Sequence, residues 1–329
     1  MDFIAIGDTT VDEFIRLKEV EIKCDDQNEN CTLSMKWGDK IPYDSSVLVP
    51  AVGNAANAAV AAARLGLKAG FISNVGNDHF GKEIIATFAR EGVDTQYVAV
   101  NNGIPTNHHF VLCYEAERTI LIRHEAYPYA IPEGLIAPKW IYLSSIGDNS
   151  ESFHAELAQW LTEHPETKLA FQPGTFQMEM GKEKLAPLYA CAEVVACNKE
   201  EAERILEIGE TDIQELLQNM HALGPSIVLI TDGTSGAYAS NGTEMFKVPM
   251  YPDSKPPIDR TGAGDAMASS FVAALALGKP IKEALLWGPI NSMSVVQKIG
   301  AQEGLLTRTE LEKLLADAPT DYCVQQLGE

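Results

Sequence analysis

The stretch "AGFISNVGNDHFGKEIIATFAREG", residues 69–92, decides the fold class. It begins with a short apolar run that ends at Gly76, the pattern of a buried strand. An amphipathic helix follows, with Ile84, Ile85 and Phe88 on one side and Gly92 at its end. A buried strand that leads so directly into a helix is typical of a parallel sheet covered by helices.

The same alternation extends outward in both directions. A short apolar strand at residues 2–7 and an alanine-rich helix at residues 54–66 come before it. After residue 125 we expect strands at 139–147, 168–174, 193–198 and 226–233, and helices at 151–164, 199–209 and 263–278. The sequence therefore predicts an α/β protein with a Rossmann-like three-layer αβα core and a mainly parallel sheet.

Two segments interrupt this order. Residues 13–51 and 97–125 alternate between polar and apolar side chains and have little helical periodicity, which predicts short exposed strands and hairpins. We expect them to combine into a small β-rich lid over the substrate site. The core would then comprise residues 1–12, 52–96 and 126–329.

Composition limits the class of protein. Hydrophobic residues make up 46% of the 329, no apolar run reaches the length of a membrane span, and the N-terminus lacks a secretory signal, so we expect a cytoplasmic protein without a membrane partner. Acids outnumber bases by 46 to 25, and a net charge of -21 opposes binding to nucleic acid. A polyphosphate ligand must therefore be held by local donors, such as backbone amides or a bound cation.

Cysteine usage adds little to the functional argument. The spacing of the six cysteines fits free thiols better than a disulfide framework. Cys24 and Cys31 are close enough in sequence to suggest a metal site, but no second pair accompanies them, so free thiols remain the favoured interpretation. The six are Cys24, Cys31, Cys113, Cys191, Cys197 and Cys323.

The stretch "DRTGAGDAM", residues 259–267, predicts an anion site at the start of the last long apolar helix. Thr261 is placed to cap that helix, and small side chains leave the first amides accessible at the positive end of the helix dipole. These amides belong to Gly262, Ala263 and Gly264.

Asp265 lies in the first turn beside this anion site, and the residues alone allow two roles for it. Phosphoryl transfer to an alcohol needs a group that takes the hydroxyl proton, so Asp265 is a candidate general base. A carboxylate in a first turn also complements the helix dipole without any catalytic role. Both interpretations stay open on this stretch alone.

Several motifs together resemble one family. The stretches resemble, in the family's order and over nearly the whole chain, those of the ribokinase-like carbohydrate kinases, or PfkB family. They are "AVGNAANAAVAAARLG" (51–66), "VGNDHFG" (75–81), "NKEEAE" (198–203), "TDGTSGAY" (231–238) and "DRTGAGDAM" (259–267). The resemblance implies that Asp265 is the catalytic base and that Gly262, Ala263 and Gly264 form the anion hole for the transferring phosphate.

The resemblance also implies a nucleotide and metal site. Asn198 and Glu201 match the motif that organises Mg²⁺ and the ATP phosphates through water, although the same pair is also a passable helix capping box. Asp259 and Gly300 match a loop that binds a monovalent cation, such as K⁺, in relatives. The remaining nucleotide-binding candidates are Thr231, Asp232, Gly233, Gly236 and Asn291.

On the acceptor side, the resemblance assigns sugar binding to Asp12, Gly53, Asn54 and Asn57, whose groups suit the hydroxyls of a polyol, and to Asp265 as well. Asn57 is also interpretable as an ordinary helix residue.

There are departures from the family pattern. Val52 replaces a glycine, Asn54 a lysine, and Ser270 a glycine or alanine, while Arg260 replaces a small residue and either contacts phosphate or points to solvent.

The favoured function is a kinase that uses ATP and Mg²⁺ to phosphorylate a hydroxymethyl group of a ribose-like or fructose-like sugar. A nucleoside kinase and a non-catalytic binding relative are the alternatives. A dinucleotide-dependent dehydrogenase is disfavoured, because this sequence lacks the glycine motif of that class after its first strand. Leu33, Met35 and Trp37 predict a homodimer through the lid. His108, His109 and Arg118 in the lid either contact substrate or are inert.

Overall fold

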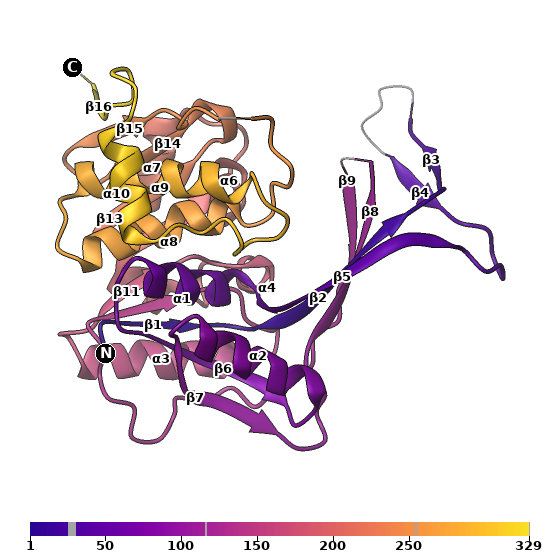
Figure 1. Cartoon of the computed structure of the whole chain (residues 1–329). Coiled ribbons are helices and arrows are strands. Elements are labelled where there is room, and N and C mark those ends of the chain that lie inside the picture. Colours follow the sequence, from indigo (N-terminus) through magenta and orange to yellow (C-terminus); the bar gives the residue numbers. More distant parts are fainter. Residues whose placement is uncertain (26–30, 116, 254, 329) are drawn as a thin grey trace.

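A computed structural model describes residues 1–25, 31–115, 117–253 and 255–328. Within these residues a ten-stranded sheet has the order β16-β15-β14-β13-β12-β11-β10-β1-β6-β7 (Figure 1). Its parallel strands are β1 (Phe3–Ile6), β6 (Ala69–Gly76), β7 (Asp94–Asn101), β10 (Trp140–Leu143), β11 (Lys168–Phe171), β12 (Ala192–Asn198) and β13 (Ile227–Thr231). Antiparallel strands β14 (Ala237–Ser240), β15 (Met245–Val248) and β16 (Gln325–Leu327) complete one edge.

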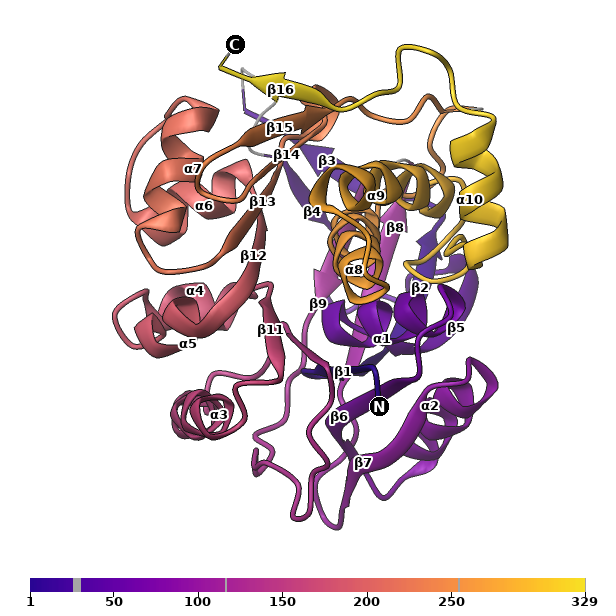
Figure 2. The ribbon, with the colours of Figure 1, turned by 90° about the vertical axis from the view of Figure 1, so that its left-hand side faces the viewer.

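Helices cover both faces of this sheet (Figure 2). One face packs on α1 (Asn54–Arg64), α2 (His79–Arg90), α8 (Ala263–Ala276), α9 (Ile281–Val295) and α10 (Arg308–Ala316). The other packs on α3 (Glu151–Glu163), α5 (Ala186–Cys191), α6 (Lys199–Leu206) and α7 (Ile213–His221), with the short α4 (Thr175–Met180) beside them. Side chains alternate along β1, so Phe3 packs against the helices on the first face of the sheet and Ile4 against those on the other face. The predicted three-layer α/β fold is confirmed.

A second sheet, the lid sheet, projects from the core (Figure 1). It has the order β5-β2-β8-β9, formed by β5 (Tyr43–Val52), β2 (Thr10–Leu17), β8 (His108–Tyr114) and β9 (Glu117–Leu121). Both interrupting segments contribute strands to it. The parallel pairing of β2 with β8 puts Asp12 opposite His109. Residue 116, in the turn expected between β8 and β9, lies outside the described residues.

Part of the second interrupting segment does not form a hairpin strand as expected. Residues 97–101 are the end of β7, which pairs in parallel with β6 at the edge of the large sheet. The alternation of this strand reflects its position, because an edge strand with one face towards solvent has the same pattern as a hairpin strand.

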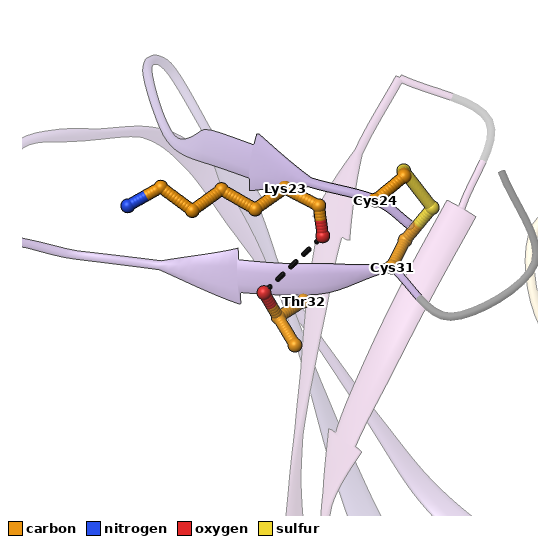
Figure 3. Close-up of a disulfide and its surroundings, with 4 residues drawn as sticks. All are labelled: Lys23, Cys24, Cys31 and Thr32. Carbon is orange, nitrogen blue, oxygen red and sulfur yellow. Dashed lines mark hydrogen bonds between the residues drawn. A yellow bond between two sulfur atoms is a disulfide. The ribbon is translucent and has the colours of Figure 1, made fainter. Parts of the chain in front are cut away.

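The expectation of free thiols is wrong for two cysteines. A disulfide joins Cys24 to Cys31 next to the antiparallel strands β3 (Glu21–Lys23) and β4 (Thr32–Ser34), as Figure 3 shows. The pairing of Lys23 with Thr32 brings the two cysteine Cα atoms within 4.0 Å. Residues 26–30, part of the long first insertion, lie outside the described residues. The free cysteines are Cys113, Cys191, Cys197 and Cys323.

None of the helices in the described part of the chain is long and apolar enough to cross a membrane.

Candidate active site

Two cavities meet at the carboxyl ends of the parallel strands, the edge at which α/β sheets bind ligands. The lid cavity, of about 500 Å³, lies under the lid sheet. The loop cavity, of about 470 Å³, lies between the ends of β12 and β13 and the start of α8. Asn54 and Asp265 line both cavities, so Asp265 stands at their junction.

Asp265 is a buried carboxylate held by three amide donors. Asn54 Nδ2 and Gln172 Nε2 donate to Oδ1 at 2.9 and 3.1 Å, and Asn57 Nδ2 donates to Oδ2 at 2.8 Å. Burial raises the pKa of Asp265, although these hydrogen bonds act in the opposite direction. The donors come from α1 and from the end of β11, so two elements fix the orientation of the carboxylate.

The start of α8 leaves its first amides without a side-chain cap. Gly262 is the N-cap residue with φ 78°, and no side chain bonds to this end of the helix. A Cβ at Gly262 would overlap with Ala301, so the turn needs glycine both for its φ and for this close approach. A Cβ at Gly264 would meet no atom within 4 Å. The anion site at these amides stays a prediction.

Thr261 is not the helix cap that the sequence predicts. Its backbone N–H and its hydroxyl both donate to Asp259 Oδ1, because that carboxylate lies only two residues earlier in the same turn. Gly300 N–H donates to Oδ2 at 2.9 Å. Asp259 therefore links the loop before α8 to the loop that contains Gly300.

The residues around Asp259 do not fit a monovalent cation. Arg118 Nη1 from the lid donates to Asp259 Oδ1 at 2.8 Å, so this oxygen already accepts three hydrogen bonds. A cation needs free oxygen ligands, whereas here N–H and O–H donors and a guanidinium surround the carboxylate. Burial alone would raise the pKa of Asp259, but the hydrogen bonds from Thr261 and Gly300, together with Arg118, hold it below its ordinary value.

Asn198 and Glu201 line the loop cavity and form the capping box of α6. The capping box is confirmed, and their role towards Mg²⁺ and phosphate stays a prediction. Asn198 Oδ1 accepts from Glu201 N–H at 2.7 Å, and Glu201 Oε2 accepts from Asn198 N–H at 2.8 Å. Burial, with the negative charge of Asp265 nearby, raises the pKa of Glu201. A cavity lined by such carboxylates is suited to a divalent cation.

No group of three or more His, Cys, Asp or Glu side chains in the described ranges is placed to hold a metal ion. That finding is compatible with Mg²⁺, which commonly uses one or two carboxylates, waters and substrate phosphates. Glu201, through water, fits such a role. Arg260 lines the same cavity and is the single base among its described lining residues.

The remaining nucleotide candidates lie in three different places. Thr231 and Gly233 line the loop cavity. Asp232 and Gly236 do not, and instead close the turn between β13 and β14 through a backbone hydrogen bond of 2.9 Å. Asn291 is fully buried between helices. It donates to Ser270 Oγ and accepts from Leu306 N–H, which also explains the serine at position 270.

Every predicted acceptor-binding residue lines the lid cavity. They are Asp12, Gly53, Asn54, Asn57 and Asp265. Gly53 has φ 123°, and a Cβ there would lie 2.7 Å from the carbonyl oxygen of Asp8, so the backbone requires glycine. Gln302 Nε2 donates to Asn57 Oδ1 at 2.9 Å, which fixes the amide of Asn57 with its Nδ2 towards Asp265.

The sequence assigned no role to Asp8 of the lid cavity or to Gln172 of the loop cavity, and for His109 it left open whether the side chain contacts substrate or is inert. Asp8, which follows β1, accepts from the hydroxyl of Tyr129 and lies 3.4 Å from His124 Nδ1. His109 Nδ1 lies 3.3 Å from Asp12 Oδ1, and its buried Nε2 has no partner in the described structure. The signal for Asp8 and Gln172 is their position directly beyond buried strands. The signal for His109 is the alternation of side chains along β8. It puts His109 on the face of Asp12 and His108 on the opposite face, near Glu13.

Comparisons with known proteins give the family and the fold of the chain. A family model described as "pfkB family carbohydrate kinase" matches residues 20–308. The chain is 28% identical over 288 residues to ribokinase of Bacillus subtilis (85% of this chain, 92% of that protein). It is also 28% identical over 285 residues to 5-dehydro-2-deoxygluconokinase of Bacillus subtilis (80% and 86%). The structure of Arabidopsis thaliana ribokinase complexed with ribose and ATP has the same fold, with a TM-score of 0.79 at 22% identity over 95% of this chain and 98% of that one.

Proposed function

The chain belongs to the pfkB family and is a carbohydrate kinase, and from that premise we propose that it transfers the γ-phosphoryl group of ATP to a hydroxymethyl group of a sugar bound in the lid cavity. The observation that carries the proposal is the position of Asp265. Its buried carboxylate stands where the two cavities meet, so a base there reaches an acceptor on one side and a phosphate on the other.

In the proposed reaction Asp265 acts as general base. The acceptor hydroxyl oxygen forms a bond to the γ-phosphorus while the bond from that phosphorus to the β,γ-bridging oxygen breaks, and ADP leaves with the electron pair. The hydroxyl proton passes to the carboxylate of Asp265. Amide donors from Asn54, Asn57 and Gln172 hold this carboxylate in one orientation, which favours proton transfer along a fixed direction.

The start of α8 would stabilise the transferring phosphoryl group. Backbone amides of Gly262, Ala263 and Gly264 lie at the positive end of the helix dipole, and in a water-poor site such donors stabilise the charge that develops on the phosphoryl oxygens. Arg260 lines the same cavity, so its guanidinium is available to the polyphosphate.

ATP would occupy the loop cavity, with Thr231, Gly233 and Asn198 beside it. Mg²⁺, held through water by Glu201 and Asn198, would supply positive charge to the phosphates. Glu201 needs such a partner because the charge of Asp265 and its own burial both disfavour its ionised form. The capping box uses the backbone N–H and Oδ1 of Asn198. Its Nδ2 is therefore available to a phosphate or to water.

The lid cavity favours an uncharged sugar of the ribose or fructose type. Its described lining includes the carboxylates of Asp8, Asp12 and Asp265 and no lysine or arginine, so an acidic acceptor would meet like charge. Carboxylates, amides and imidazoles offer directed acceptors and donors to hydroxyl groups. B. subtilis ribokinase is thus the better functional guide among the two curated relatives named above.

A nucleoside is the second candidate, because the lid cavity also has an apolar side. Phe14, Ile120, Ile122 and Phe176 line it, and Ile122 is 64% exposed. A flat base attached to the sugar would cover such side chains. A plain sugar would leave more of them in contact with water.

A coupled assay with ATP and Mg²⁺ tests the proposal. The acceptor panel is ribose, fructose, ketodeoxygluconate, adenosine, inosine and cytidine, with acceptor-free reactions that measure idle hydrolysis. We expect turnover with a neutral sugar, and turnover with nucleosides alone supports the second candidate. The proposal is wrong if acceptors bind, as measured by calorimetry, and none becomes phosphorylated.

We also infer a homodimer through the lid, at the insertion of residues 13–51. Trp37 is fully exposed, and Met35, Tyr43, Val47 and Leu48 on the same insertion are each more than two-fifths exposed. Exposed apolar side chains of this size favour an interface over contact with water. Sedimentation of the full chain and of Trp37→Ser tests the inference, with a concentration-dependent dimer expected only for the former.

A further inference from the structure

Arg118 makes the one Lys or Arg ion pair that joins the lid sheet to the core within the described ranges. Its Nη1 lies 2.8 Å from Asp259 Oδ1, with the arginine side chain 36% and the aspartate side chain 12% exposed. Arg118 belongs to the lid sheet and Asp259 to the core, so this contact forms only when the lid sheet is in the position seen in this structure.

Asp259 also forms hydrogen bonds to the two loops at the anion site. The same carboxylate accepts from the backbone N–H and the hydroxyl of Thr261, which precedes Gly262 at the start of α8. Its other oxygen accepts from Gly300 N–H, and Gly262 packs closely on Ala301. A change in the charge beside Asp259 therefore acts on both loops that shape the anion site.

Arg118 also fixes the wall of the lid cavity. Residues 118 and 120 lie on the same face of β9 because side chains alternate along a strand. Ile120 and Ile122 line the lid cavity. The ion pair thus holds the edge strand of the lid sheet at the place where its apolar side chains face the acceptor.

We propose that Arg118 is a positioning residue that supplies, from the lid, the positive charge which the family resemblance assigns to a monovalent cation at Asp259. The inference rests on the proposed kinase function. The guanidinium neutralises a largely buried carboxylate, and Oδ1, which already accepts three hydrogen bonds, has no lone pair left for an ion. Turnover is then independent of K⁺, and the order of the anion site depends on the lid.

The test compares Arg118→Met, which keeps an apolar stem, with Arg118→Lys, which keeps the charge. Arg123→Ala is the matched control, because Arg123 pairs with Glu125 near the same strand and is 68% exposed. Kinetics are measured with the best acceptor in KCl and in tetramethylammonium chloride at equal ionic strength. Hydrogen exchange of the amides at residues 259–264 and 117–122 gives a readout that needs no turnover.

We expect the wild type and Arg123→Ala to turn over equally in both salts. Arg118→Met is expected to lose about tenfold in kcat/KM, with faster amide exchange in both segments, because the loop is no longer held. The kcat/KM of Arg118→Lys should lie between that of the wild type and that of Arg118→Met. KCl should restore part of the kcat/KM lost in Arg118→Met, because a small ion then has access to Asp259.

Three results overturn the inference: a wild type that stalls without K⁺, an Arg118→Met variant that equals Arg123→Ala in both readouts, and a loss that KCl does not restore. A wild type that phosphorylates no acceptor in either salt overturns the proposed function instead. The exchange measurement still decides the role of Arg118 in that case.

Discussion

The loop cavity and the lid cavity share Asp265 and Asn54 but are built in different ways. The loop cavity includes two short local motifs, the turn before α8 and the capping box of α6. The lid cavity draws single side chains from many separate strands and loops. The first arrangement suits a phosphate, which needs amides at a helix end, and the second suits a polyol, which needs donors and acceptors around it.

The largest effect is expected at the junction of the two cavities. Asp265→Asn removes the base while keeping the shape, so kcat should fall by at least ~10², with little change in nucleotide affinity. Steady-state kinetics and calorimetry with ADP measure the two quantities. Near-normal turnover in this variant would mean that Asp265 serves the helix dipole alone.

The pH dependence of kcat/KM should report the same carboxylate. Because burial raises the pKa of Asp265 above its ordinary 3.8, the active, ionised form is present at higher pH and is lost as pH falls through that raised value. Below it the rate should fall about tenfold per pH unit. An acidic limb at or below 3.8 contradicts the assignment, and its persistence in Asp265→Asn assigns the limb to another group.

A change confined to the loop cavity comes next. Gly262→Ala places a Cβ against Ala301 at a residue with φ 78°, so the turn must shift and its amides with it. We expect a loss of about tenfold to a hundredfold in kcat, with a lower Tm. Gly264→Ala is the stability control, because no atom lies within 4 Å of its Cβ and its Tm should not fall. Equal Tm values for the two variants contradict the expected strain.

A change confined to the lid cavity should affect the acceptor alone. Asp12→Asn removes a charge that lies 3.3 Å from His109 Nδ1 in the cavity, so the KM for the acceptor should rise about tenfold while that for ATP stays constant. Glu13→Gln, on the opposite face of β2, should leave both constants within about twofold. If the two variants behave alike, the lid cavity is not the acceptor site.

The same difference explains what the sequence predicted. The turn from Gly262 to Asp265 and the pair Asn198 and Glu201 are local, so their spacing alone indicates a helix end and a cap. Gln172, the residue directly after β11, is brought to Asp265 only by the order of the strands in the sheet. Single-sequence reasoning contains no information on that order.

Two errors have the same origin. Thr261 has the right type and position for a helix cap, but the nearby carboxylate of Asp259 competes for its hydroxyl. Asp259 itself has its predicted place, yet Arg118 reaches it from the lid across 141 positions of sequence. Neither contact has a local signal, whereas core elements such as β6 and α2 have one in their own apolar pattern.

The smallest effect is expected outside both cavities, at the disulfide between Cys24 and Cys31. Neither these cysteines nor strands β3 and β4 contribute a side chain to the lid cavity or to the loop cavity. Cys24→Ser with Cys31→Ser should therefore keep kcat and both KM values within about twofold, since no catalytic group moves. Kinetics of the double variant, with and without a thiol reductant, check this. A substantial rise in the KM for the acceptor would show that the end of the lid acts on the lid cavity through β2 and β5, and the separation between binding residues and distant lid residues would no longer hold.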